Sequence, residues 1–274
     1  MKKFTFTLSA ILILVTLSSH DMFLKLKSYY VSADSNIDIH LYNGTFDKSE
    51  NVITRDRMTD VSMIYPDGTR DRLTNDSWTD QGNITVLSTQ TKDPGSYVVG
   101  VSTLPKMIEL SSEDFNNYLA HDGVMDVLNE RKKSGEDQKN AREKYSKHVK
   151  AIFQAGASSS GHYKKKLGYP IEFIPVQNPY DLKVNGDLQV QLLSKGQPVS
   201  NQLVYASYAG FHGHSDTGGH VEAIKTRTNN KGVATITLSK AGHWYVRAIH
   251  MVKSNEEGVD YESNWATLTF EIKE

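Results

Sequence analysis

The residues best suited to chemistry lie in one glycine-rich segment, Gly210-Phe-His-Gly-His-Ser-Asp-Thr-Gly-Gly-His220. It holds His212, His214 and His220 together with Asp216, and its glycines let the backbone fold so that the imidazoles converge. Three imidazoles and one carboxylate suit divalent transition metals such as Zn, Ni, Co or Cu(II). The segment therefore predicts a metal site, and the competing interpretation is a solvated loop that binds nothing physiological.

Two further histidines, His243 and His250, lie on one expected strand. Their separation of seven residues places them on opposite faces, so they cannot share one metal ion. Trp244, Val246 and Ala248 share the face of His250 and are expected to be core, which predicts a buried, hydrogen-bonded His250. His243 lies on the other face and is a candidate additional metal ligand.

The amino terminus supplies another candidate ligand. A basic pair precedes the apolar run Phe4–Leu17, which is shorter than the about 20 residues that a membrane-spanning helix needs. Residues 1–19 are therefore expected to be a secretory signal peptide, with an uncleaved anchor helix as the alternative. Cleavage after Ser19 would make His20 the first residue, and its α-amine and imidazole could then chelate one metal ion, as in a histidine brace. Cleavage after Ser18 would leave a Ser-His start with the two groups still close.

The composition excludes several classes of function. The chain has no cysteine, which rules out disulfides, thiolate metal sites and cysteine nucleophiles. Its 31 basic and 32 acidic residues do not gather into a basic stripe, which argues against nucleic acid as a partner. No GxSxG, HExxH, GxxxxGK or GxGxxG motif occurs, so no catalytic residue is assigned and we expect a protein that is not an enzyme.

The elements that must position these residues are mostly strands. Residues 20–105 show short alternating runs between turn sequences, which predict an N-terminal β-sandwich domain of immunoglobulin-like size. Residues 169–274 show seven such runs and predict a C-terminal β-sandwich domain. The expected strands are 36–42, 61–65, 84–89 and 96–101, then 171–176, 188–193, 203–208, 221–227, 233–238, 243–251 and 265–272.

Residues 106–168 are expected to be a helical connector and linker. Ser111 and Asp114 form a capping pair, and helical spacing follows through Leu128. Apolar residues from Ala141 to Ile152 predict a second helix, with His148 packed or hydrogen-bonded on its apolar stripe. The predicted fold class is thus mostly β, with two immunoglobulin-like β-sandwich domains and a helical insertion or connector.

Several stretches resemble a family of exported bacterial proteins of unknown function. They are His20-Asp-Met-Phe-Leu-Lys-Leu26, Leu41-Tyr-Asn-Gly-Thr-Phe-Asp-Lys-Ser-Glu-Asn-Val52, Lys144-Tyr-Ser-Lys-His-Val-Lys150, Gly242-His-Trp-Tyr-Val-Arg247 and Glu262-Ser-Asn-Trp-Ala-Thr267. Some members are described as periplasmic accessory proteins for nickel or cobalt uptake. The resemblance implies a periplasmic location, β-sandwich architecture and a role with a transition metal. Residues 188–238 also resemble carboxypeptidase-regulatory or transthyretin-like sandwich modules.

The leading functional hypothesis is an exported protein that binds a divalent transition metal (Ni, Co, Cu or Zn) and presents it to a membrane metal-uptake system or buffers it. Its candidate ligands are His20, His212, His214, Asp216, His220 and His243. One alternative is a cell-envelope module that binds protein or glycan without metal. The other is a copper-binding protein that uses the amino-terminal histidine. No membrane span is expected after cleavage of the signal peptide, and the oligomeric state is left open.

Overall fold

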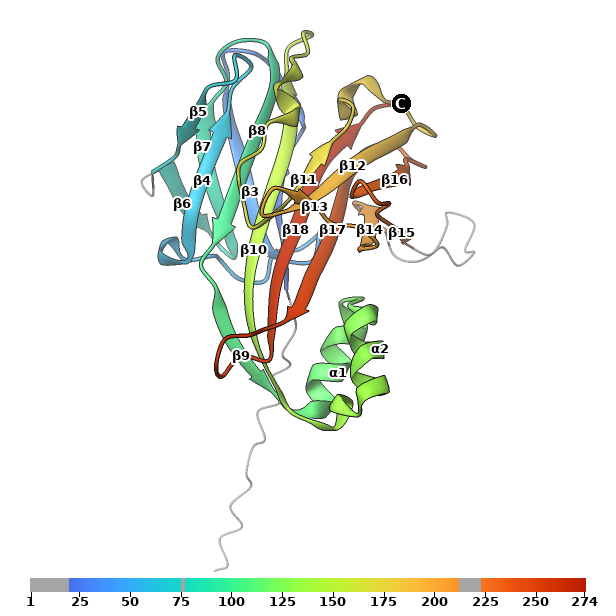
Figure 1. Cartoon of the computed structure of the whole chain (residues 1–274). Helices are drawn as coiled ribbons and strands as arrows, with labels where there is room; N and C mark the ends of the chain where they lie inside the picture. Colours follow the sequence, from blue (N-terminus) through green and yellow to red (C-terminus); the bar gives the residue numbers. More distant parts are fainter. Residues whose placement is uncertain (1–19, 75–76, 212–222) are drawn as a thin grey trace, which may run out of the picture.

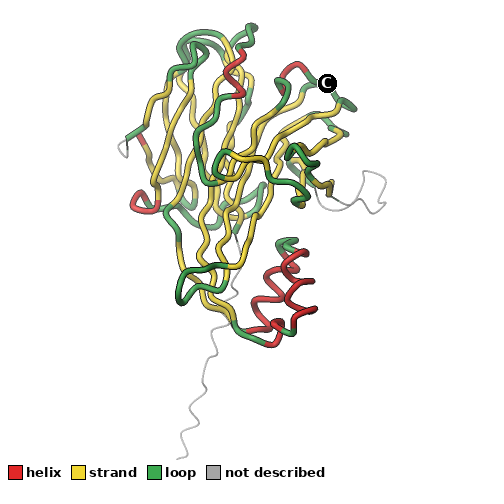
Figure 2. The backbone as a smooth tube through the Cα atoms, viewed as in Figure 1, coloured by secondary structure: helices red, strands yellow, loops and turns green. Residues whose placement is uncertain are grey.

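Alternating strands assemble into three sheets in the computed structural model of the chain (Figure 1). The structure describes residues 20–74, 77–211 and 223–274. Within these residues the largest sheet has ten strands, and two four-stranded sheets pack against it. Figure 2 shows how strongly strands dominate, with the two α-helices confined to one end of the molecule.

The large sheet forms the middle layer. Eight of its strands follow one another in space, and β2 (Tyr30–Val31) and β9 (Lys106–Leu110) pair with β10 beside them. The order of the eight is β15 (Ile224–Arg227), β14 (Leu203–Tyr208), β17 (Gly242–Lys253), β18 (Tyr261–Ile272), β10 (Ala141–Ala155), β8 (Gly95–Thr103), β4 (Met58–Ile64) and β5 (Arg70–Arg72).

The two smaller sheets cover opposite faces of the middle layer. One contains β1 (Asp21–Leu26), β3 (Asn36–Gly44), β7 (Ile84–Gln90) and β6 (Trp78–Gln81). The other contains β11 (Ile171–Pro175), β12 (Asp187–Ser194), β13 (Gln197–Pro198) and β16 (Val233–Thr237).

Successive residues of β8 and β10 show that these covers lie on opposite sides. Val99 and Phe153 pack with the β1 sheet, whereas their neighbours Val98 and Ile152 pack with the β11 sheet. Because side chains alternate across a strand, the middle sheet is buried on both faces where it is covered. The prediction of a mostly β sandwich fold is confirmed, and the expected run 221–227 is seen as β15 from Ile224.

The prediction of a helix over Ala141–Ile152 is wrong. These residues form β10, which pairs in parallel with β18 and antiparallel with β8 and β9. The strand was hidden because polar residues fill its buried positions. Lys150, for example, is 1% exposed and forms an ion pair with Glu172, with 3.0 Å between Nζ and Oε2.

The helices lie earlier in the chain, as α1 (Ser112–His121) and α2 (Met125–Ser134). The Ser111 hydroxyl accepts a hydrogen bond from the Asp114 amide at 3.1 Å, which satisfies one of the free donors at the start of α1 and confirms the capping pair. Helix α2 ends at Ser134 and is capped by Gly135, whose φ of 71° favours glycine. Apolar residues of both helices pack against β17 and β18, on the same face as the β1 sheet.

The two predicted domains share the middle sheet, because β10 lies between β18 of the C-terminal half and β8 of the N-terminal half. The domain boundaries at 105 and 168 stay a prediction. In the described part of the chain, no helix combines the length and the apolar character required to span a membrane.

Candidate functional site

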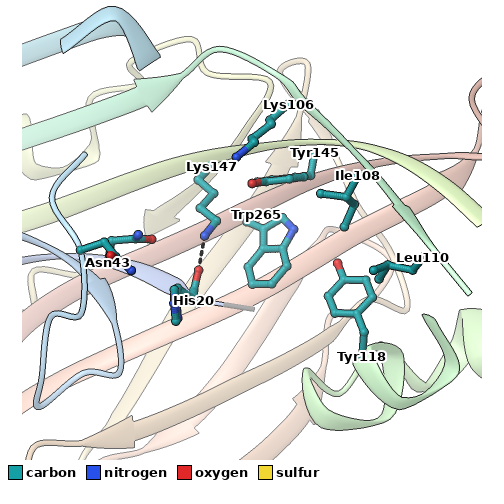
Figure 3. Close-up of a pocket in the computed structure, with 10 residues that line it drawn as sticks. His20, Asn43, Lys106, Ile108, Leu110, Tyr118, Tyr145, Lys147 and Trp265 are labelled. Carbon is teal, nitrogen blue, oxygen red and sulfur yellow. Dashed lines mark hydrogen bonds between the residues drawn. The ribbon is translucent and has the colours of Figure 1, made fainter. Parts of the chain in front are cut away.

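A cavity of about 340 Å³ lies between the β1 sheet and α1 (Figure 3). We call it the aromatic–lysine cavity. Its lining residues come from the position before β1, from β3, the segment after β3, β9, β10, β18 and α1. They are His20, Asn43, Asn51, Lys106, Ile108, Leu110, Tyr118, Tyr145, Lys147 and Trp265. A second hollow of about 490 Å³ shares Asn43, Lys106, Tyr145 and Lys147 with it.

The fold explains why these side chains converge. Alternation along β10 sends Tyr145 and Lys147 to the face that carries the β1 sheet and the helices, while Lys150 points to the opposite face. Lys147 lies directly opposite Trp265 in the parallel register of β10 and β18. The floor of the cavity is therefore formed by β10 and β18 of the middle sheet, and its walls are β9, α1, β3 and the residue before β1.

Lys147 places a positive charge in a largely buried position. Its side chain donates a hydrogen bond to the His20 carbonyl oxygen, and its Nζ lies 5.1 Å from the centre of the Trp265 ring. Burial lowers the pKa of Lys147 to about 8, against the opposing attraction of Asp21 and Asp122. The group is therefore still mostly protonated at pH 7, and it is held close to the amino-terminal end of β1.

A buried carboxyl group lies behind the aromatic wall of the cavity. Glu143 is fully buried, and its Oε1 accepts hydrogen bonds from the Tyr118 hydroxyl, at 3.0 Å, and from the Ser263 hydroxyl. Burial raises the pKa of Glu143 to about 7, although these two hydrogen bonds act in the opposite direction. The hydrogen bond fixes the Tyr118 ring, which stacks on Trp265 with 6.4 Å between ring centres and an interplanar angle of 15°.

His20 stands at the edge of this cavity with its side chain facing a carboxylate. Its Nε2 lies 3.2 Å from Oε2 of Glu50, and its imidazole is one-fifth exposed. Burial and the nearby Lys147 lower the pKa of His20, against the opposing effect of Glu50. The lowered pKa favours the neutral imidazole, which is the form that binds metals. The next residue, Asp21, is held by Arg247, with 3.5 Å between Oδ2 and Nε.

Of the remaining predicted ligands, only His243 lies within the described residues, and it does not join His20. His212, His214, Asp216 and His220 lie outside the described residues. His243 contacts Glu271 at 3.7 Å and packs on Tyr29. Arg247, the partner of Asp21, lies four residues further along β17, which is about 13 Å along the strand. His243 is therefore separated from Asp21 and from its neighbour His20. In residues 20–74, 77–211 and 223–274, no three His, Asp or Glu side chains form a metal-sized cluster.

Two further histidines, His148 and His250, lie in β10 and β17. His148 is buried and hydrogen-bonded to Ser102, Ser146 and Asn264, as expected, but it lies on a strand and not on a helix. His250 is partly buried, and its Nδ1 is 3.0 Å from Oε1 of Gln202. Its hydrogen bond is confirmed, and Trp244, Val246 and Ala248 are core as predicted.

Sequence reasoning missed most of the cavity. Lys147, Tyr145 and Glu143 were hidden by the wrong assignment of a helix, because their alternation is visible only once the segment is recognised as a strand. Trp265 and Tyr118 come from elements more than 100 residues apart, and no local pattern reveals their contact. The one available signal was the i, i+2 spacing of Glu143, Tyr145 and Lys147.

The chain has only low similarity to solved structures. Trypsin-activated alpha-2-macroglobulin from Escherichia coli is 8% identical with a TM-score of 0.25, covering 92% of this chain but 16% of its own. The D0-D1 domain of Intimin is 15% identical with a TM-score of 0.22, covering 91% and 97%. Two fibronectin type-III domains from chicken tenascin are 11% identical with a TM-score of 0.23, covering 90% and 98%.

No curated protein is significantly similar in sequence. The family model described as domain of unknown function DUF4198 matches residues 17–252. Because this match covers most of the protein, the chain belongs to the DUF4198 family, a family of unknown function.

Proposed function

We propose that the chain is exported, is cleaved before His20, and binds a divalent transition metal ion through the new amino terminus. The observation that carries this proposal is the 3.2 Å contact between Nε2 of His20 and Oε2 of Glu50. Histidines that bind metals commonly donate their other ring N–H to a carboxylate, which fixes the tautomer and the orientation of the ring. Glu50 would hold the proton on Nε2, so that Nδ1 would be the ring nitrogen that binds the metal.

Cleavage would complete a chelate. Signal-peptide removal after Ser19 converts the His20 backbone nitrogen into an amine, and this amine and Nδ1 of the same residue can close a six-membered ring with one metal ion. Both donors must be deprotonated to bind. The depressed pKa of the His20 imidazole supports this at neutral pH, whereas an ordinary α-amine, with a pKa of about 7.7–8.0, must release its proton.

The residue that begins the histidine-rich segment, Gly210, contacts the turn before Glu50. The backbone N–H of Gly210 donates to the Asp47 carboxylate at 3.1 Å. Asp47 lies in the turn that leads from β3 to Glu50, the partner of His20. In this proposal His212, His214, Asp216 and His220 supply further donors, and the experiment below separates their contribution from that of His20.

The donor set determines which metals are expected. Nitrogen and carboxylate donors without thiolates favour Cu(II) over Ni, Co and Zn, while Mg and Ca prefer all-oxygen sites. The resemblance to accessory proteins of nickel or cobalt uptake supports a role in delivering or buffering these ions in the periplasm. A membrane uptake system would then be the partner, and the leader-like residues 1–19 support export.

The test is calorimetric titration of the mature chain beginning at His20 with Ni(II) and Cu(II) at pH 7. Glu50→Ala should weaken binding about 10- to 100-fold, the usual effect of losing such a carboxylate partner. Glu109→Ala, which removes an exposed carboxylate from β9, is the matched control and should bind as the wild type does. Changing His212, His214 and His220 together to Ala measures the contribution of the loop.

Two results would contradict the proposal. If Glu50→Ala and Glu109→Ala bind equally well, Glu50 does not position a metal ligand. If neither the mature chain nor its loop variant binds either metal, an interaction module without metal becomes the better explanation.

A further inference from the structure

The aromatic–lysine cavity has a chemistry that metal binding does not use. We infer that it binds a small organic acid in which a carboxylate is attached to a six-membered ring. This inference goes beyond the proposed metal site and does not rest on it, because the recognising groups are the side chains of Lys147, Lys106 and Trp265 (Figure 3). The volume of about 340 Å³ is at the lower end of the range of small-molecule sites.

One side of the cavity suits a flat ring. The indole of Trp265 and the phenol of Tyr118 are nearly parallel, at 15°, and Ile108 and Leu110 of β9 add an apolar surface beside them. The hydrogen bonds from Tyr118 to Glu143, and from Nε1 of Trp265 to Ser263 at 3.2 Å, hold both rings in place. A ring-shaped ligand would therefore meet a preorganised surface, at little entropic cost.

The other side of the cavity is positively charged. Lys147 is 8% exposed, and an ammonium group has three N–H donors. The His20 carbonyl accepts one of them, and the others can serve an anion. Lys106 lies on β9 at the same opening, and none of the described residues lining this cavity is acidic. A carboxylate would partner a largely buried cation, whereas an ammonium ligand would be repelled.

The neighbouring hollow extends the positive region. It shares Lys106 and Lys147 with the aromatic–lysine cavity and adds Arg57, with Asp56 as the acidic member of its lining. Asn43 lines both spaces and offers amide groups for the hydroxyls of a sugar ring. The ring acid could thus be an aromatic acid or a uronic acid, and both present the same carboxylate on a ring.

The experiment uses ring compounds that differ mainly in charge. Calorimetry or ligand-observed NMR of the mature chain, with EDTA present, compares benzoate with benzamide and benzylamine, and D-glucuronate with D-glucose. We expect one acid to bind about tenfold or more tightly than its neutral counterpart, with benzylamine weakest. Preference for benzoate identifies an aromatic acid, and preference for glucuronate identifies a uronic acid. EDTA makes the result independent of metal binding.

Variants locate the bound acid. Lys147→Met removes the largely buried cation, and Lys106→Met removes the exposed one. Each variant should bind the acid more weakly and should show a smaller difference in affinity between the acid and the neutral compound. Lys144→Met is the control. It removes the same charge from β10 three positions before Lys147, on the other face of the strand, where Lys144 forms an ion pair with Glu256. Absence of binding by both acids, equal affinity for the acid and its neutral counterpart, or an equal loss in Lys144→Met would overturn the inference.

Discussion

Replacing Lys150 should severely destabilise the chain, because the change leaves a buried carboxylate without its cation. Lys150 and Glu172 are 1% and 3% exposed, and Nζ lies 3.0 Å from Oε2. Lys150 also donates to the Phe173 carbonyl at 3.1 Å. Lys150→Met keeps the approximate volume of the side chain but leaves the buried Glu172 carboxylate without a cation. The expected cost is about 3–5 kcal/mol in the free energy of unfolding.

The cost arises from the buried charge of Glu172, and a change at Glu172 can test this. Glu172 also accepts hydrogen bonds from the backbone N–H groups of Leu167 and Gly168, both at 3.0 Å. In Lys150→Met, Glu172→Gln the buried charge disappears, while an amide oxygen can still accept one of these bonds. The double variant should therefore be more stable than Lys150→Met alone, because an unpaired charge costs more than an unpaired polar group.

Urea unfolding followed by tryptophan fluorescence and by circular dichroism measures these differences. Lys166→Met, which removes an exposed lysine near the same pair, is the control and should change stability by less than about 0.5 kcal/mol. The reasoning is refuted if Lys150→Met is as stable as Lys166→Met, or if the double variant is less stable than Lys150→Met.

Three further predictions concern packing, pH and export. Gly100→Ala should cost about 1–3 kcal/mol by urea unfolding, because a Cβ there would clash with Cδ1 of Leu167; Gly82→Ala, where φ is +59° and the space is open, measures the cost of backbone strain without a clash. The pKa of Glu143 is raised to about 7 in the folded chain, so the wild type should lose stability from about pH 4.5 to 7 as pH rises, and Glu143→Gln should lose less over that interval. Intact mass of the exported protein should correspond to a start at Ser19 or His20, whereas recovery of the full-length chain from membranes would exclude cleavage.

The sequence predicts strands well where one face is polar or where apolar residues are continuous. Alternation in Asn36–Gly44 gives β3, and the run Leu203–Tyr208 is β14 with the predicted bounds. Strand β10 fails because it is central and buried, yet it contains Lys147, His148 and Lys150. Their burial is compensated by hydrogen bonds or an ion pair from distant segments, and a hydrophobicity pattern does not contain those partners.

One residue of the candidate site could be predicted from the sequence, and its neighbours could not. His20 was predicted from its position after a leader-like segment, which is local information. Its partner Glu50 and the cation Lys147 are brought to it by the pairing of β1 with β3 and by the packing of the β1 sheet on β10. Such contacts depend on topology, so the sequence indicates the proposed metal ligand but not the residues that surround it.

The most direct test of metal binding at the amino terminus compares two chains that differ only before His20. One begins at His20, and the other carries the extension Gly-Ser-Gly-Ser-Gly, which moves the α-amine away while leaving the imidazole and Glu50 in place. Calorimetry with Ni(II) at pH 7, in buffers of different ionisation enthalpy, measures affinity and proton release together. In the background lacking the three loop histidines, the His20 start should bind more tightly and release about 0.8–0.9 proton from its amine per metal ion. Equal affinity and equal proton release in the two chains would contradict the proposal.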